Sequence, residues 1–174
     1  TCALPIWFSG SEETDASLRS RFGQLVTRAL AGKLNHWSAE DMGLIALVLL
    51  LDQFTRNIYR GTAESFAGDA AALELVRPVV ASGRHEALPP IHQVFLFMPF
   101  EHCESLAAQE QCIHLFNELA TRSDAVRINQ SARYAVAHRD VIARFGRFPH
   151  RNLILGREST RQEIDFLKQP GSSF

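Results

Sequence analysis

The chain has 174 residues, of which 46% are hydrophobic and 21% charged, and its formal net charge is −1. These values are typical of one globular domain with its own core, and the near-neutral charge argues against nucleic acid as the main partner. The longest apolar run is Leu44 to Leu51, far short of the roughly 20 residues that span a bilayer, so we expect no membrane segment.

The first six residues and the three cysteines carry little information about the fold. The opening TCALPI matches a translated sequencing-adapter tail, so we exclude Thr1–Ile6 and expect a single domain over 7–174. Three cysteines are too few for a disulfide scaffold. Free thiols and a cytoplasmic location are the simpler interpretation.

Hydrophobic residues recur at helical spacing along the chain, and we find no Asn-Gly or Asp-Gly hairpin signal. The spacing predicts helices over about 18–30, 39–59, 70–81, 90–102, 106–122 and 125–145, a short piece at 152–155, and a last helix that starts near 160 and ends before 170. The run from 44 to 51 is apolar on every side, which is typical of a central, fully packed helix.

Local signals set the expected helix ends. Ser38 followed by Asp41, and Thr160 followed by Glu163, read as capping boxes, and Asp69 can cap the third helix. Proline removes a backbone donor and clashes with the preceding turn. We therefore expect the prolines at 78 and 99 to kink or shorten their helices.

About seven helices with short connections predict an all-α domain, and stacked antiparallel pairs are the favoured arrangement. No strict 34-residue repeat is visible, so a regular solenoid does not follow from the pattern alone.

Arginine is concentrated in one part of the chain. Residues 127–161 contain eight arginines, two acids and no lysine. Arginine suits bidentate pairing with carboxylate or phosphate. These side chains either pair with the protein's own acids, which is the commoner arrangement, or face an anionic ligand.

Several apolar segments end in clusters of His, Arg, Asn and acids, at DQFTRNIYR, FEHCE, AHRD and FPHRN. If these ends converge, they form a cleft suited to an anionic ligand or a peptide. The ligand-binding candidates are Arg56, Asn57, Arg60, Arg139, His150, Arg151 and Asn152.

An enzyme, hydrolase-like in character, is the first alternative. A histidine would act as general base, a carboxylate would orient it, and Arg56 or Arg151 would clamp the developing charge. The catalytic candidates are His102, His138, Glu101 and Asp140. The second alternative is a buried polar network with a purely structural role.

The motifs of metal and cofactor sites are missing. The sequence has no HExxH, EF-hand loop, Walker A, GxGxxG or GxSxG pattern. Although Glu101, His102, His138, Asp140 and His150 include competent metal ligands, we predict neither a metal nor a cofactor.

Four long motifs carry a family resemblance: LLLDQFTRNIYRGTAESFAGD, FMPFEHCESLAAQE, AHRDVIARFGRFPHRNLILGRES and EIDFLKQPGSSF. In this order they resemble a bacterial family known as domain of unknown function 924. The resemblance implies an all-helical, tetratricopeptide-repeat-like fold and supplies no activity. Departures from the family are Thr55 in place of the usual Pro, Cys103 in place of Ser, and the extra Pro78.

Overall fold

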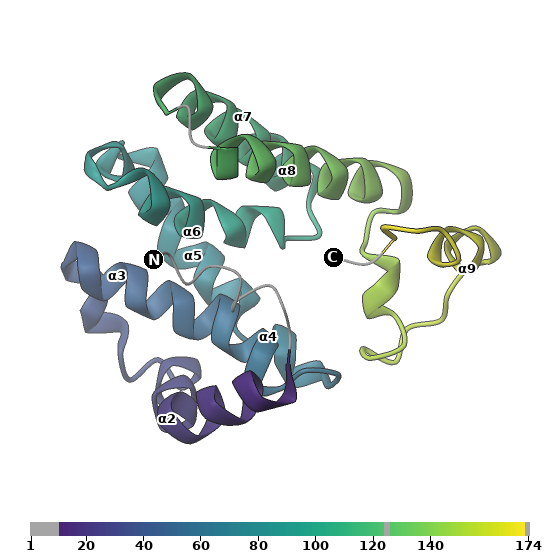
Figure 1. The fold of residues 1–174 in the computed structure, drawn as a ribbon, viewed down its shortest axis with the longest axis horizontal. Helices are drawn as coiled ribbons and strands as arrows, with labels where there is room; N and C mark the ends of the chain where they lie inside the picture. Colours follow the sequence, from purple (N-terminus) through teal and green to yellow (C-terminus); the bar gives the residue numbers. More distant parts are fainter. Residues whose placement is uncertain (1–10, 124–125, 173–174) are drawn as a thin grey trace. The chain divides into compact units, whose positions relative to one another are not determined.

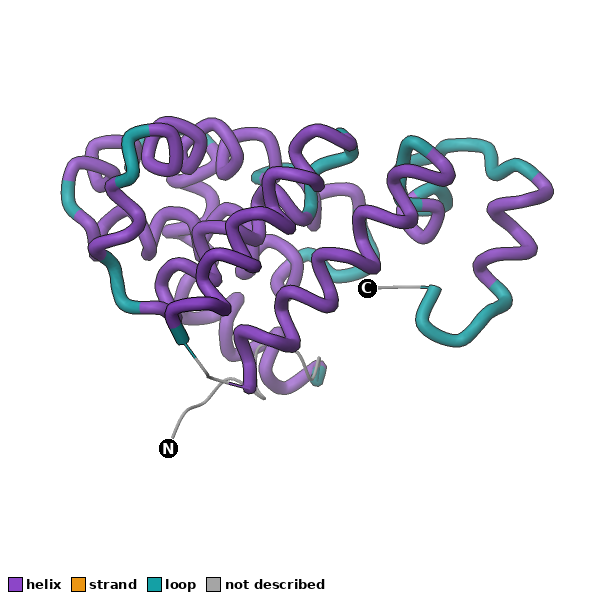
Figure 2. Tube along the Cα trace, turned by 90° about the horizontal axis from the view of Figure 1, so that it is seen from above, coloured by secondary structure: helices purple, strands orange, loops and turns teal. Residues whose placement is uncertain are grey.

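The computed structural model describes residues 11–123 and 126–172, and every regular element within these ranges is helical (Figures 1 and 2). The predicted all-α class is confirmed. By its internal contacts the chain divides into two compact units, residues 1–99 and 100–174. The repeat-like pairing and the single domain over 7–174 stay predictions, and our interpretation of residues 1–6 lies outside the described part of the chain.

The first unit is built from helices joined by short 3-10 turns. Its elements are α2 (Glu12–Leu30), α3 (Asp41–Val48), a π-helical turn (Leu49–Phe54), α4 (Thr55–Ile58), α5 (Asp69–Ala81) and most of α6 (Pro90–Glu101), with 3-10 turns at Asn35–Ala39, Ala63–Phe66 and Arg84–Ala87. The Ser11 side chain accepts the Thr14 N–H at the start of α2. Leu18 and Val26 of that helix pack with Leu51 in the main core cluster.

The long helix predicted over 39–59 is interrupted. It consists of α3, the π-helical turn and α4. The capping box predicted at Ser38 is wrong, because Glu40 occupies the N-cap position of α3 without a capping side-chain hydrogen bond, and the Ser38 hydroxyl donates to the Asn35 carbonyl at 2.7 Å. Within the wider turn, the Thr55 hydroxyl donates to the Leu51 carbonyl at 2.7 Å, so a side chain satisfies this backbone acceptor.

Gly68 fixes the start of α5 against the π-helical turn. A Cβ atom at this position would lie 2.0 Å from the Leu51 carbonyl oxygen, so only glycine allows the approach. Gly68 itself is the N-cap residue and Asp69 is the first residue of α5. The predicted capping role of Asp69 is therefore wrong, and its carboxylate is left to contact other side chains.

Neither internal proline ends its helix. α5 continues through Pro78 to Ala81, and α6 continues through Pro99 to Glu101. The predicted end of the third helix near residue 81 is confirmed, and the kink or distortion expected at each proline stays a prediction.

The second unit contains α7 (Leu106–Arg122), α8 (Val126–Phe145), a 3-10 turn at Pro149–Arg151 and α9 (Arg161–Leu167). α7 and α8 pack side by side (Figure 1). The predicted span of α7 is confirmed, and so is the capping box of α9: Thr160 accepts the Glu163 N–H while Glu163 accepts the Thr160 N–H. The short helical piece predicted at 152–155 is wrong in position, because the turn forms three residues earlier, after Pro149.

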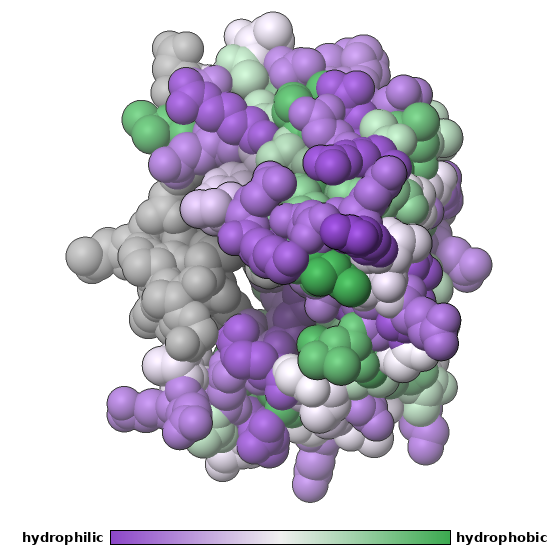
Figure 3. All heavy atoms as spheres, turned by 90° about the vertical axis from the view of Figure 1, so that its right-hand side faces the viewer, coloured by the Kyte–Doolittle hydropathy of each residue, from purple (hydrophilic) through white to green (hydrophobic). Residues whose placement is uncertain are grey.

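In the described part of the chain, no helix combines the length and hydropathy needed to cross a bilayer. On the face that Figure 3 shows, hydrophilic side chains predominate and hydrophobic ones lie in small separate groups.

Candidate anion-binding site

The polar residues at the end of the apolar helix in the first unit pair with acids of that unit. Arg56 binds Asp69 through two hydrogen bonds of 2.6 and 3.0 Å. Its Nη1 also donates to the Asp52 carbonyl at 3.0 Å and lies 3.5 Å from the Asp52 carboxylate. The guanidinium thus joins α4 to the start of α5.

Arg60 makes an equivalent link to α2. It donates to Asp15 at 2.7 and 3.1 Å, and the hydrogen bond from Asp15 raises the pKa of Arg60. It also donates to the Asn57 amide oxygen at 2.7 Å, while the Asn57 amide nitrogen donates to the Gln53 carbonyl. Arg56, Asn57 and Arg60, predicted as ligand-binding residues, therefore support the structure of the first unit.

In the second unit, three predicted segments meet around the ring of Phe148. The His138 ring contacts it edge-on with centroids 5.5 Å apart, and the His150 ring lies 5.6 Å away. The Arg151 guanidinium stacks on the Phe148 ring at 4.4 Å. His102 reaches the same place, with its ring centroid 6.2 Å from that of His138. We call His102, His138, His150, Arg151 and Phe148 the Phe148 cluster.

His138 is buried in this cluster, as are Arg151 and Phe148. Its Nδ1 lies 2.8 Å from the Tyr134 carbonyl and 3.0 Å from the Glu101 carboxylate, so this nitrogen carries the proton and donates. Burial lowers the pKa of His138 to about 3, and the nearby charges of His102, Arg151 and His150 act in the same direction. Although a carboxylate favours the charged ring, desolvation prevails here, and the Glu101 contact is a hydrogen bond to neutral imidazole.

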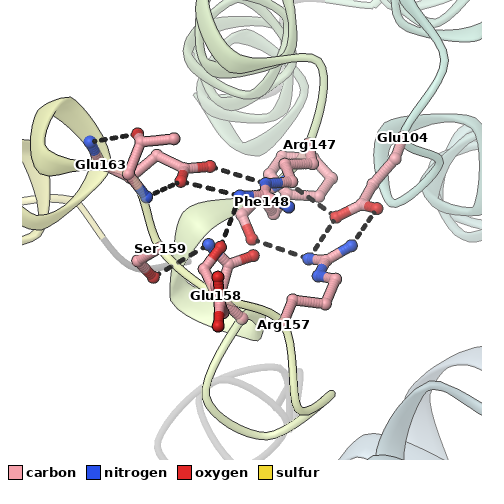
Figure 4. Close-up of polar contacts among 9 residues, drawn as sticks. Glu104, Arg147, Phe148, Arg157, Glu158, Ser159 and Glu163 are labelled. Atoms are coloured by element: carbon pink, nitrogen blue, oxygen red, sulfur yellow. Dashed lines mark hydrogen bonds and ion pairs between the residues drawn. The ribbon is translucent and has the colours of Figure 1, made fainter.

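Glu104 holds the backbone of Phe148 in place (Figure 4). Its carboxylate accepts the Phe148 N–H at 2.8 Å and two hydrogen bonds from Arg157 at 2.7 and 3.0 Å, and Arg157 also donates to the Phe148 carbonyl. Burial acts to raise the pKa of Glu104, but the hydrogen bonds from Arg157 and Phe148 outweigh it and the pKa is lowered. Both peptide groups of the central ring residue are thereby fixed.

A second ion pair closes the loop that follows the cluster (Figure 4). Arg147 binds Glu163 at 2.7 and 2.9 Å and the Glu158 carbonyl at 2.8 Å. The hydrogen bond from Arg147 lowers the pKa of Glu163 to about 2. The Asn152 amide donates to Ser159 at 3.0 Å, so Asn152, predicted as a ligand-binding residue, braces this loop.

The structure thus brings some of the predicted residues of the second unit together and places others elsewhere in it. His138, His150 and Arg151 contact the Phe148 ring, and Glu101 and His102 contact His138. Arg139 and Asp140 form a surface ion pair at 3.1 Å, with 36% and 63% of their side chains exposed.

The expected pairing of the arginine segment with the protein's own acids forms at Arg147 and Arg157, but sequence reasoning missed the central place of Phe148. No local pattern gives the particular partners, because Glu104 lies 44 residues from Phe148 and 53 from Arg157. The lysine-free arginine segment was the available signal, since bidentate pairing with carboxylates favours arginine.

The side chains of this region do not form a cage for a cation. Within residues 11–123 and 126–172, no three His, Cys, Asp or Glu side chains are grouped closely enough to hold a metal ion.

Comparison with known proteins agrees with the fold and leaves the activity open. A family model described as bacterial protein of unknown function (DUF924) matches residues 3–171. No curated protein matches the chain. Among solved structures, that of the protein of unknown function ATU0120 from Agrobacterium tumefaciens is 36% identical with a TM-score of 0.84, and the match covers 93% of this chain and 88% of that one.

Proposed function

Since the chain belongs to the DUF924 family of bacterial proteins of unknown function, we propose from its own geometry that it binds an anionic ligand or peptide at the Phe148 cluster. The observation that carries this proposal is that His150 and Arg151 contact the Phe148 ring beside the neutral His138, while His102 contacts the His138 ring. Three basic side chains from two separate segments thus lie against these two rings.

The charges around the cluster support an anion. Glu104 is engaged by Arg157 and by the Phe148 N–H. Glu101 is buried and contacts His138. His102 and His150 are only half-buried, which leaves part of each ring at the surface.

The test is isothermal titration calorimetry with inorganic phosphate, citrate and a short peptide whose C-terminus is free or amidated. His150→Gln keeps a polar side chain but cannot gain charge, and the exposed His36→Gln is its matched control. Because hydrogen bonds to charged groups contribute about 1.5 to 3 kcal/mol, we expect His150→Gln to weaken binding about tenfold and His36→Gln to leave it unchanged. Equal affinity in both variants, or no heat with any probe, would refute the proposal.

An enzyme is the second candidate, favoured by the Glu101 carboxylate 3.0 Å from His138 Nδ1. A carboxylate on one ring nitrogen orients a histidine to act as a base through the other. Burial raises the pKa of the Cys112 thiol, which argues against this cysteine as a nucleophile. A hydrolase panel run on the wild type and His138→Asn tests the role, and activity that survives the substitution would exclude His138 as the base.

A further inference from the structure

A groove separate from the Phe148 cluster runs between α8 and α9 in the second unit. Its volume is about 230 Å³, and its lining includes Val141, Arg144, Phe145, Phe166 and Gly171. Sites for drug-sized ligands measure roughly 300 to 1,000 Å³, so this groove suits a small molecule.

Two aromatic rings form the apolar part of the groove. Phe145 and Phe166 lie with ring centroids 5.1 Å apart and planes inclined by 50°. Both pack on the buried cluster of Val141, Ile142 and Phe148. A floor supported in this way changes little on binding, and each ring is still half-buried rather than covered.

One cation stands over this floor. The Arg144 guanidinium lies 4.7 Å from the Phe145 ring and 5.8 Å from the Phe166 ring. Among the residues that the structure describes, no carboxylate lies within ion-pair distance of Arg144. The next arginine along the chain, Arg147, is paired with Glu163. Asp140 also lines the groove, but its carboxylate is paired with Arg139.

We propose that this groove binds a small carboxylic acid with an apolar body. The apolar body lies on Phe145 and Phe166, and the carboxylate accepts hydrogen bonds from Arg144. Stacking holds the guanidinium plane over the rings, so its edge donors are oriented before the ligand arrives. Phe148 supports the rings of the groove from below, and no other residue of the Phe148 cluster takes part in the groove. Either site can therefore bind a ligand without the other.

The test is an NMR titration of the full chain with 3-phenylpropionate, followed by amide chemical shifts. We expect saturable shifts confined to the C-terminal half of α8, α9 and Gly171. The neutral 3-phenylpropanamide and the small acid acetate each lack one half of the ligand, so both should bind at least tenfold more weakly.

Arg144→Gln removes the cation, and Arg133→Gln on the same helix is its matched control, because Arg133 is exposed and lies outside the groove. Hydrogen bonds to charged groups contribute about 1.5 to 3 kcal/mol, so Arg144→Gln should weaken binding 10- to 100-fold while Arg133→Gln changes nothing. Equal binding of acid and amide, or equal loss in both variants, would overturn the proposal. So would tighter binding of a tripeptide ending in free Phe, because a peptide end would then be the ligand.

Discussion

The end of the apolar helix in the first unit and the Phe148 cluster in the second contain the same residue types but organise them differently. At the first, Arg56 and Arg60 each make two hydrogen bonds to one carboxylate, on Asp69 and Asp15. At the second, Arg151 and two histidines surround an aromatic ring. Carboxylates from neighbouring helices bind both arginines of the first group, whereas in the second the basic side chains lie against aromatic and imidazole rings.

This difference shows that arginine and asparagine at the end of a buried helix do not by themselves indicate a binding site. What matters is whether the fold supplies an acid for each cation. Within the second unit the same contrast recurs, since Arg147 and Arg157 fix the loop through Glu163 and Glu104, while Arg144 stands over two rings. The arginines with carboxylate partners build the frame, and Arg144 is the candidate for recognition.

Among these changes, we expect Gly68→Ala in the first unit to cause the largest loss of stability. The new Cβ would lie 2.0 Å from the Leu51 carbonyl oxygen, and backbone on both sides must move to relieve the clash. Overpacking of this kind costs about 3 kcal/mol or more of unfolding free energy. Urea denaturation measures it.

Gly23→Ala is the matched control for this change. A Cβ there meets only the Arg19 side chain at 3.9 Å, and alanine is favoured over glycine inside a helix such as α2 by up to about 1 kcal/mol. We expect Gly23→Ala to be neutral or stabilising. A Gly68→Ala protein as stable as the wild type would contradict the close approach of α5 to the π-helical turn.

The second region is expected to respond to pH through His138. Its folded pKa of about 3 lies below the ordinary value of 6.5, so the unfolded chain binds a proton between these values while the folded protein does not. Stability is therefore lost as the pH falls from 6.5 towards 3, by about 1.4 kcal/mol per pH unit and about 2 kcal/mol at pH 5. His138→Asn keeps a donor for the Tyr134 carbonyl and cannot titrate.

Urea denaturation of wild type and His138→Asn at pH 7.5, 6 and 5 checks this prediction. The variant should be less stable at pH 7.5, because it loses the ring contact with Phe148, and the difference should shrink as the pH falls. A constant or widening difference would mean that the His138 ring is charged in the fold and paired with Glu101.

Features of the fold that depend on residues close together in the sequence could be predicted, and those that depend on distant residues could not. Local signals worked for α7, for the capping box of Thr160 and Glu163, and for the all-α class. Periodicity could not reveal the π-helical turn, because one extra residue per turn leaves an entirely apolar run looking the same. Thr55 stands where the family resemblance implies Pro, and its hydroxyl reaches the Leu51 carbonyl.

For the candidate site, the sequence indicated which residues could take part but not which side chains each of them contacts. The segments at 56, 101, 138 and 150 were predicted to converge. Those at 101, 138 and 150 contact one another within the second unit, whereas the segment at 56 belongs to the first unit and its convergence with them stays a prediction. Whether a cation is neutralised depends on acids far away in the chain, such as Asp15 for Arg60 across 45 residues. The groove at Arg144 was missed for a similar reason, since Phe166 comes from another helix.

We expect the smallest loss of stability from Arg56→Gln, which tests whether the paired arginines of the first unit are structural. Its side chain is 21% exposed and that of Asp69 is 19% exposed, so the loss lies between that of a surface pair and that of a buried one, at about 1 to 2 kcal/mol. A double-mutant cycle with Asp69→Asn should give a coupling energy of similar size. Because Arg56 acts within the frame of the first unit, Arg56→Gln should leave phosphate and citrate binding unchanged at matched folded concentration. A loss of binding with little loss of stability would instead make Arg56 a recognition residue, and a bidentate pair with an acid of the same unit would no longer indicate a structural role.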